Sequence, residues 1–254
     1  MQFNINSLIG RKVEATDGNI GEVVEFYFDD KTWTVRYLIV KTGNWLSGRK
    51  VLISTVALIN GFLEDGSFPV NLTKEQIIKS PDIDTDEPVS RQHEIELYNY
   101  YAWDNYWGSG FYGGGYMLPA TFYAPIEEEI KRASADGDKH PEGDQHLRSS
   151  ERVTGYHIHA NDGEIGHVAD FIADSYNWKI DFIVIDTHNW IGGKKVLADV
   201  KHIKEIEWEN SKVFLDVTIA AVEKFKLFNK SDFSAIETVE EIKIHIPIIP
   251  NIIH

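Results

Sequence analysis

Two histidines in this 254-residue chain have a spacing that could bind a metal. His157 and His159 alternate along an expected strand, so both imidazoles point to the same side, as a metal site requires. His167 and His188 follow in the same region, but the sequence places no third ligand. Surface or hydrogen-bonded histidines are the simpler interpretation. His157 and His159 are kept as metal candidates, while no metal site and no cofactor are predicted.

Other patterns typical of catalytic or ligand-binding sites lack the flanking elements or residues that such sites require. Residues 108–113 have the Gly-x-Gly-x-x-Gly spacing of a dinucleotide site, but aromatic and proline-rich flanks replace the required strand and helix. Residues 82–86 open like a calcium-binding EF-hand loop, yet Glu87 and His93 occupy the positions that need Gly and Glu. The sequence contains no cysteine, nucleophile elbow, His-Glu-x-x-His motif or P-loop. We therefore predict that the chain is not an enzyme.

An internal repeat indicates which elements position these residues. Residues 15–23 and 160–168 share the pattern Ala-x-Asp-Gly-x-Ile-Gly-x-Val. The offset of 145 residues continues without a gap from Gly10 and Gly155 to Thr73 and Thr218. The chain therefore reads as two copies of a module of roughly 70 residues, separated by an unrelated middle.

Each copy begins with a hairpin signal. An Asp-Gly pair predicts a tight turn in which both positions have positive φ. Three residues later, a glycine lies inside a strand pattern, which indicates a bulge or a close approach of another backbone. These positions are interpreted as structural: Asp17, Gly18, Gly21, Asp162, Gly163 and Gly166.

The later strands of each copy are apolar enough to need cover. Residues 33–39 and 178–184 alternate apolar and polar side chains, which predicts strands with one buried face. Residues 37–40 and 182–185 are apolar on both faces, so another segment should cover them. Five or six short strands per copy favour closure into a small barrel, because closure removes exposed strand edges.

We thus predict a mainly β protein with two small antiparallel β-barrels, short helices and an aromatic-rich bridge. The first barrel is assigned to residues 1–80 and the second to residues 151–230. Residues 81–150 are assigned to a helix followed by an aromatic, glycine-rich and acidic linker. Residues 231–254 form a tail that could add an edge strand.

Aromatic and cationic side chains supply the candidate binding surface. Eleven aromatic residues lie between positions 97 and 123, and they either staple the two barrels together or form an exposed patch for a partner. Residues 45–50 and 190–195 each place a tryptophan beside two cations, a composition typical of protein-interface anchors. Alternatively, these rings plug the barrel ends and the cations are solvated. The candidate partner-binding residues are Trp45, Arg49, Lys50, Trp103, Trp107, Trp190, Lys194 and Lys195.

The charge balance restricts the partners. Twenty-five basic and 40 acidic residues give a net charge of −15, which opposes broad attraction to nucleic acids or anionic membranes. Residues 1–80 are neutral, with 9 residues of each sign. Residues 105–126 are uncharged but rich in glycine and proline, so no spanning helix and no membrane insertion are expected. Without a signal-peptide pattern at its start, the chain is expected to be cytoplasmic.

The repeated motifs carry a family resemblance. The Asp-Gly-x-Ile-Gly-x-Val pattern, the later Trp, the Asn-Trp pair and the Lys-Val-Leu segment of each copy resemble the PRC-barrel domain. This small β-barrel is named from the cytoplasmic domain of the photosynthetic reaction centre H subunit, and it also resembles a domain of a bacterial ribosomal maturation factor. Residues 80–94 and 146–159 look like a bacterial family with two such barrels in tandem. The resemblance implies mainly architecture.

Relatives in this family use the barrel to bind proteins or to steady a larger assembly. The resemblance therefore implies a protein-interaction or assembly module whose partner is another protein, a second copy of the chain included. The alternative is a small-ligand or metal-binding protein that uses the cleft between the barrels, lined by His157, His159 and the aromatic bridge. The missing membrane helix argues against a photosynthetic role, and the acidic charge argues against ribosome binding.

Overall fold

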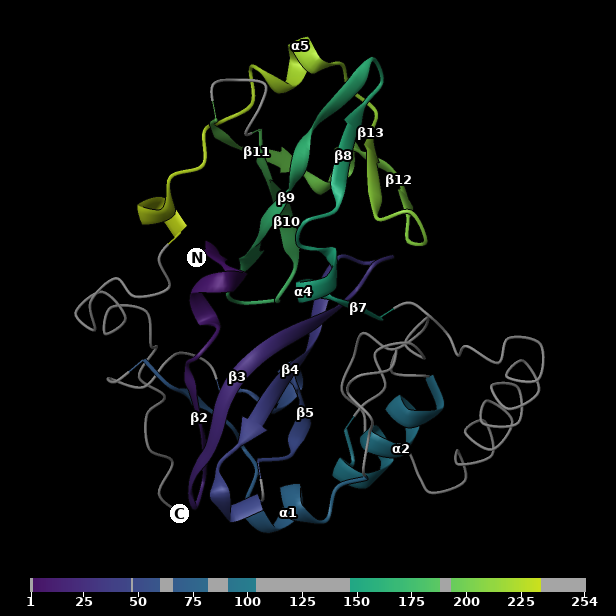
Figure 1. Cartoon of the computed structure of the whole chain (residues 1–254). Helices are drawn as coiled ribbons and strands as arrows, with labels where there is room; N and C mark the ends of the chain where they lie inside the picture. Colours follow the sequence, from purple (N-terminus) through teal and green to yellow (C-terminus); the bar gives the residue numbers. More distant parts are fainter. Residues whose placement is uncertain are drawn as a thin grey trace, which may run out of the picture.

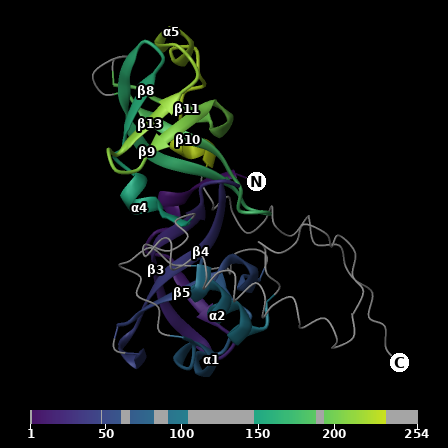
Figure 2. The same cartoon turned by 90° about the vertical axis from the view of Figure 1, so that its right-hand side faces the viewer.

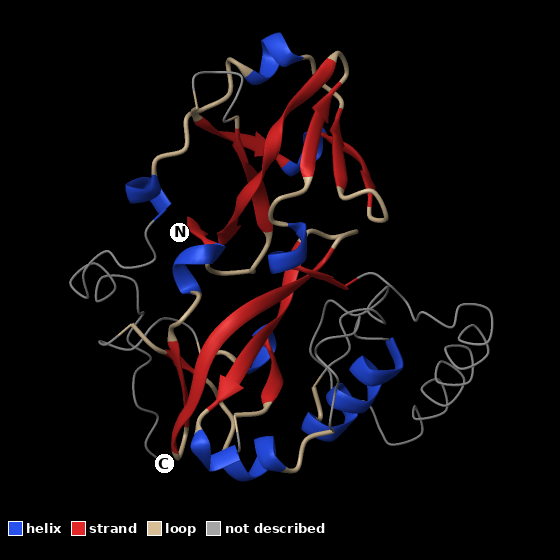
Figure 3. Cartoon of the chain, viewed as in Figure 1, coloured by secondary structure: helices blue, strands red, loops and turns tan. Residues whose placement is uncertain are grey.

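The computed structural model describes residues 2–46, 48–59, 66–81, 91–103, 147–187 and 193–233. In these residues the protein is mainly β, with two sheets and short helices (Figures 1 and 3). The first half of the chain forms the lower sheet in Figure 1 and the second half forms the upper one. Among the described helices, none has the length and apolar character that a bilayer crossing requires.

The first sheet has six strands in the order β5-β4-β3-β2-β6, with β7 on β3. Its strands are β2 (Lys12–Ala15), β3 (Gly18–Asp29), β4 (Thr34–Thr42), β5 (Lys50–Ser54), β6 (Phe68–Pro69) and β7 (Leu147–Ser149). The helices of this half are η1 (Ile5–Leu8), η2 (Asn44–Leu46), η3 (Thr55–Ala57), α1 (Lys74–Ile78) and α2 (Arg91–Tyr101). Thr73 and Gln76 form a capping box at the start of α1, because each side chain accepts a hydrogen bond from the backbone N–H of the other residue.

The second sheet has seven strands in the order β11-β10-β9-β8-β13-β12, with β1 on β9. Its strands are β1 (Gln2–Asn4), β8 (His157–Ala160), β9 (Gly163–Asp174), β10 (Ile180–Asp186), β11 (Lys195–Asp199), β12 (Ile203–Glu207) and β13 (Lys212–Leu215). Its helices are α4 (Ser150–Val153), η5 (Val200–His202), α5 (Ile219–Val222) and η6 (Lys230–Phe233). The bounds of β8, β9, β11 and η5 follow those of β2, β3, β5 and η3 at an offset of 145.

The prediction of closed, purely antiparallel barrels is wrong in two respects. Both sheets are mixed, because β2 pairs with β6 in parallel and β8 pairs with β13 in parallel. After β5 the chain crosses over through η3 and returns beside β2 in the same direction as β2. In the described part of the chain the strands do not close into a ring; the edges β5 and β6 are joined by η3 and by a bridge between Leu58 and Val70.

The hairpin tips differ from the predicted turn. Only Gly18 and Gly163 have positive φ at these tips, whereas Asp17 and Asp162 do not. Asp17 instead accepts a hydrogen bond from the backbone N–H of Lys74 at 2.9 Å, at the start of α1. Asp162 accepts one from Ile219 at 2.8 Å, at the start of α5. The aspartates therefore fasten a helix start as well as forming part of the turn.

The predicted close backbone approach is confirmed at both interior glycines. A Cβ on Gly21 would overlap the carbonyl oxygen of Lys41 on the neighbouring strand. A Cβ on Gly166, which also has φ +143°, would overlap the carbonyl oxygen of Asp186. Only glycine allows the two strands to lie this close together.

A bulge alters the predicted alternation in the strand that follows. Tyr27 pairs with Tyr37 and Phe28 pairs with Val35, so Arg36 is an extra residue. Val35 consequently faces the main core, while Tyr37 lies on the opposite face of the sheet. The register shifts in the same way around Asp181 in β10. The expectation that residues 33–39 alternate on one face is therefore wrong, because a bulge reverses the phase of a strand.

The expectation that another segment covers these strands is confirmed. In the first half, Leu97 and Tyr98 of α2 pack on Tyr37 and Ile39. Figure 2 shows α2 in the lower half of the molecule, with β3, β4 and β5. In the second half, Phe233 of η6 and the nearby Phe228 pack on the equivalent face, against Ile172, Val184 and Leu197.

The other face of both sheets contributes to one continuous core. This core contains Phe28 and Leu38 from the first sheet together with Phe171 and Ile183 from the second. Because the halves share this core and exchange strands, the sheets alone do not test the predicted boundaries at 80, 150 and 230, which stay predictions.

Candidate functional site

The halves are joined by a reciprocal exchange of strands. β1, at the start of the first half, pairs with residues 172–174 of β9. β7, which lies 145 residues after β1, pairs with residues 27–29 of β3. Each long strand has 12 residues and spans about 40 Å. On one edge its neighbour, β2 or β8, has only four residues, so the far end of that edge is completed by the other half.

A symmetric pair of backbone hydrogen bonds marks the centre of this junction. Val35 N–H donates to the carbonyl of Trp178 at 2.9 Å, and Ile180 N–H donates to the carbonyl of Trp33 at 2.6 Å. Both tryptophans have positive φ, 53° and 59°, which is strained for a bulky residue. Two equivalent residues that retain the same strained conformation indicate that the junction itself has two-fold character.

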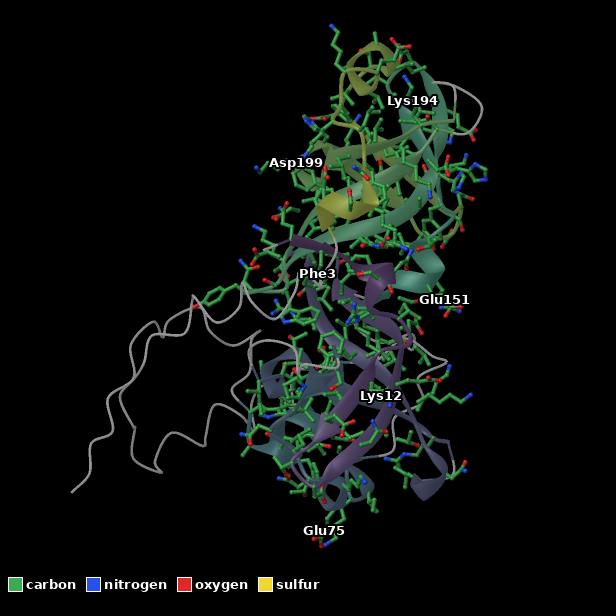
Figure 4. All side chains as sticks on the ribbon, turned by 90° about the vertical axis from the view of Figure 1, so that its left-hand side faces the viewer. Phe3, Lys12, Glu75, Glu151, Lys194 and Asp199 are labelled. Atoms are coloured by element: carbon green, nitrogen blue, oxygen red, sulfur yellow. The ribbon has the colours of Figure 1, made fainter. Side chains whose placement is uncertain are left out.

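Aromatic side chains fill the space between the halves. Phe3 of β1 is 1% exposed and lies edge-on to Trp178, with ring centroids 5.2 Å apart. Figure 4 shows Phe3 at the level where the two halves meet. Phe28 contacts Phe171 across the junction at 5.3 Å and also stacks on Trp33. The described residues between the halves thus form a packed interior.

Two buried carboxylates at equivalent positions hold the exchanged segments. Asp170 accepts hydrogen bonds from the Asn4 side chain at 2.8 Å and from Asn6 N–H at 3.1 Å. Glu25, which precedes Asp170 by 145 residues, accepts one from the Ser149 hydroxyl. Burial raises the pKa of both carboxyls above their ordinary values, and these hydrogen bonds oppose the shift. Sequence reasoning missed this pair; the signal was an acidic residue at the same place in both copies.

A buried polar network positions α2 on the first sheet only. Tyr37 Oη donates to Glu94 at 2.8 Å, and the hydroxyls of Ser54 and Tyr98 lie 3.2 Å apart. Glu94 is 2% exposed. In the second half, Phe182 and Asp199 replace the tyrosine and serine of the sheet. The hydroxyls of Tyr37 and Ser54 therefore give the first sheet hydrogen-bonding partners for α2 that the second sheet lacks at the equivalent positions.

The end of α2 meets the end of α1 and forms what we call the α1–α2 corner: Arg49, Ile78, Tyr100, Tyr101 and Trp103. Tyr100 Oη donates to the carbonyl of Gln76 in α1 at 2.8 Å. Tyr101 and Trp103 stack with centroids 4.4 Å apart, and burial raises the pKa of Tyr101 to about 12. Ile78 and Tyr100 are exposed, at 47% and 38%. The corner combines exposed apolar surface with aromatic rings.

A cation from a neighbouring loop completes the corner. The guanidinium of Arg49 donates to the hydroxyl of Ser80 at 3.4 Å, just beyond the end of α1. Its charge also acts on the Tyr101 hydroxyl. Arg49 and Trp103, predicted from different segments, are therefore brought to one region by α1 and α2.

The remaining predicted binding residues do not join this corner or are not described. Lys194 lies at the opposite end of the molecule from Glu75 of α1 (Figure 4). Lys50 and Lys195 are exposed first residues of equivalent strands, and Lys195 lies 3.7 Å from Asp186. The side chain of Trp45 and all of Trp107 and Trp190 lie outside the described residues. The two predicted tryptophan–cation loops thus do not form one site.

The aromatic run is described only as far as Trp103. Its described rings pack α2 on its own sheet, since Tyr98 contacts Tyr37 edge-on and Trp103 contacts Tyr98. The glycine-rich pattern at 108–113, the aspartates of 82–86 and the C-terminal strand prediction lie outside the described residues.

The two candidate metal ligands lie on β8 around one carboxylate. His157 Nδ1 is 2.8 Å from Glu164, whereas His159 Nε2 is 4.0 Å from the other oxygen of that carboxylate. His159 also stacks on Phe214. Over the described part of the chain, no three His, Asp or Glu side chains are arranged to hold a metal ion. The hydrogen-bonded interpretation accounts for His157, whereas the buried Nε2 of His159 has no hydrogen-bond partner among the described residues.

Comparison with known proteins matches one segment of the chain to a domain family. Residues 1–77 match the family model of the PRC-barrel domain. The matched segment includes β1 to β6 and α1 almost to its end, so the chain contains a PRC-barrel domain. A search of curated proteins found no match.

Proposed function

We propose that the chain is a non-catalytic binding module, in which a second PRC-type module, assigned to residues 151–230, is locked to the first. The observation that carries this proposal is the reciprocal exchange of β1 and β7. Because each half completes the other's long strand, the two halves hold their surfaces in one fixed relation. Two surfaces that carry different side chains and are held rigidly together suit the assembly of a complex better than the turnover of a substrate.

The use of the buried carboxylates supports a non-catalytic role. Glu25, Glu94 and Asp170 each accept hydrogen bonds that fasten a strand or a helix. A general acid or base has to reach a substrate, whereas these groups face the protein interior. The pKa values of Glu25 and Asp170 are raised because these carboxyls are buried at the junction. We therefore assign them to holding the fold together.

We assign the α1–α2 corner as the surface that binds another protein. Tyr and Arg are enriched at interface hot spots, and the corner contains the exposed Tyr100 and the half-buried Arg49. Ile78 is 47% exposed here, and the equivalent residue of the second half is Glu223. The fold therefore does not need an apolar side chain at this position, which leaves binding as the reason for it.

The setting of this module is part of the same proposal. The net charge of −15 supports a protein partner over a nucleic acid and is consistent with a cytoplasmic module. The likeness to the reaction centre H subunit extends in this proposal to the barrel alone. A small ligand between the halves remains the alternative, but the rings of Phe3, Phe28 and Phe171 occupy the described junction.

The experiment is a quantitative pull-down from a cell extract with the full chain as bait. Ile78→Glu gives the corner the residue of the second half, and Tyr100→Ala removes the exposed ring. Both are expected to lose the proteins that the unaltered chain retains. Tyr176→Ala, at a tyrosine 85% exposed in the second half, serves as the control and keeps them. Equal recovery with all three variants would contradict the assignment of the corner.

A further inference from the structure

A second exposed apolar surface lies in the first half, outside the α1–α2 corner. Val56 in η3 is 57% exposed, and Ile59, just after η3, is 49% exposed. The Ile59 N–H donates to the carbonyl of Pro69 at 2.9 Å, so the half-buried Pro69 of β6 is their neighbour. We call Val56, Ile59 and Pro69 the η3 patch.

The second half shows what the fold requires at the same positions. η5 follows β11 as η3 follows β5, with bounds displaced by 145 residues. Val56 and Ile59 correspond there to Lys201 and Lys204, and both lysines are exposed. The same 3-10 turn therefore forms with two cations, and the aliphatic side chains of the first half are not needed to make it.

We infer that the η3 patch binds the same patch of a second copy of this chain. This inference goes beyond the proposed function, because it concerns a different surface and a different occupant. In a two-fold contact the same residues face one another from both sides. An uncharged aliphatic patch meets itself without burying an unpaired charge. Lysines at these positions would oppose such a contact, since like charges would face each other.

The distribution of charge selects a second copy as the occupant. The whole chain carries a net charge of −15, so two copies repel one another over most of their surface. Residues 1–80 are the exception, with 9 basic and 9 acidic residues. The η3 patch lies within this neutral part. Residues 1–80 of two copies therefore meet without net repulsion, whereas residues 81–150, with 5 basic and 14 acidic residues, would repel their counterparts.

The test is sedimentation velocity of the full chain over a wide range of protein concentration. The unaltered chain is expected to shift from the 29.0 kDa monomer toward a species of twice that mass. Val56→Lys with Ile59→Lys is expected to remain monomeric throughout. This double variant introduces the residues that the equivalent turn already carries, and its melting curve and circular dichroism verify that it folds.

Two further measurements make the result decisive. Ile78→Glu at the α1–α2 corner removes an exposed isoleucine elsewhere and should leave the dimer intact, so failure of the proposed function and failure of this inference are separable. Added salt should strengthen the dimer, because screening over about 10 Å or less weakens the repulsion between acidic copies. A chain that stays monomeric, a double variant that dimerises normally, or a dimer that dissociates in salt would each overturn the inference.

Discussion

Replacing Phe3 by alanine tests whether the two halves fold as one unit. Phe3 lies at the start of the chain, yet its ring is 1% exposed and packs on Trp178 of the second half. Truncation of a buried phenylalanine costs about 3–5 kcal/mol, part of which is the lost edge-to-face contact. For a protein of this size, each kcal/mol of destabilisation lowers the thermal unfolding midpoint by about 2–4 °C. Phe3→Ala should therefore lower this midpoint by about 6–20 °C.

The assay combines urea unfolding with hydrogen exchange followed by mass spectrometry. In the unaltered protein, tryptophan fluorescence and far-ultraviolet circular dichroism should report one coincident transition. In Phe3→Ala, peptides from β3 and from β9 should lose protection together, because each long strand is completed by the other half. Phe3→Leu keeps most of the volume and should cost less than about 1.5 kcal/mol.

Two results would refute this reasoning. The first is a loss below about 1 kcal/mol for Phe3→Ala, which would place the ring outside a packed interior. The second is loss of protection confined to β9 while β3 keeps its own, which would mean that the halves unfold separately. Either outcome would also remove the support that the strand exchange gives to a rigid binding module.

Three other predictions concern single positions. Gly166→Ala should cost about 3 kcal/mol or more in urea unfolding, because its Cβ overlaps a neighbouring carbonyl, whereas Gly155→Ala, with positive φ but nothing within 4 Å, should cost about 1–2 kcal/mol. Burial raises the pKa of Glu25, so its protonated form stabilises the fold. This contribution is complete below pH 4.5, the ordinary pKa, and is lost as the pH rises through the raised pKa. Glu25→Gln should abolish this dependence of the urea midpoint on pH, measured from acidic to neutral pH. Tyr37→Phe removes the hydroxyl that donates to Glu94 and should cost about 1–2 kcal/mol, with faster hydrogen exchange in α2 and unchanged exchange in β9.

Local features of the fold could be predicted from the sequence where a residue type at a given place in a strand has a single physical explanation. Glycine inside a strand pattern indicated a close backbone approach, and Gly21 and Gly166 both make one. Residues apolar on both faces indicated a covering segment, and α2 provides it for Tyr37 and Ile39. These inferences needed only the neighbours along the chain.

Features that depend on distant partners could not be predicted. β1 and β7 have three residues each, too few to show a periodicity, and their places are fixed only by the open ends of β3 and β9. The bulge at Arg36 reversed the alternation because an extra residue in a strand leaves no mark in the hydrophobic pattern. The parallel pairing of β6 likewise depends on a crossover that the sequence does not specify.

The candidate site was predicted in part for the same reason. Arg49 and Trp103 lie far apart in sequence, and they share a region only because α1 and α2 end side by side. Tyr100 was predicted only as one of the eleven aromatic residues of 97–123, and Ile78 was not singled out, since an isolated apolar residue gives no sign of exposure. Comparison with the second copy could have flagged Ile78, because its counterpart is Glu223.

This comparison separates residues that the fold needs from residues that it does not. Where both copies keep the same type, as at Trp33 and Trp178, the packing of both rings on phenylalanines at the junction explains the residue. Where they differ on a buried face, a different covering element explains it, as with Tyr37 under α2 and Phe182 beside Phe228. Differences at exposed positions have neither explanation, because solvent accepts the charged residue of the second copy. Apolar residues at such positions are therefore the ones that we propose to contact another molecule.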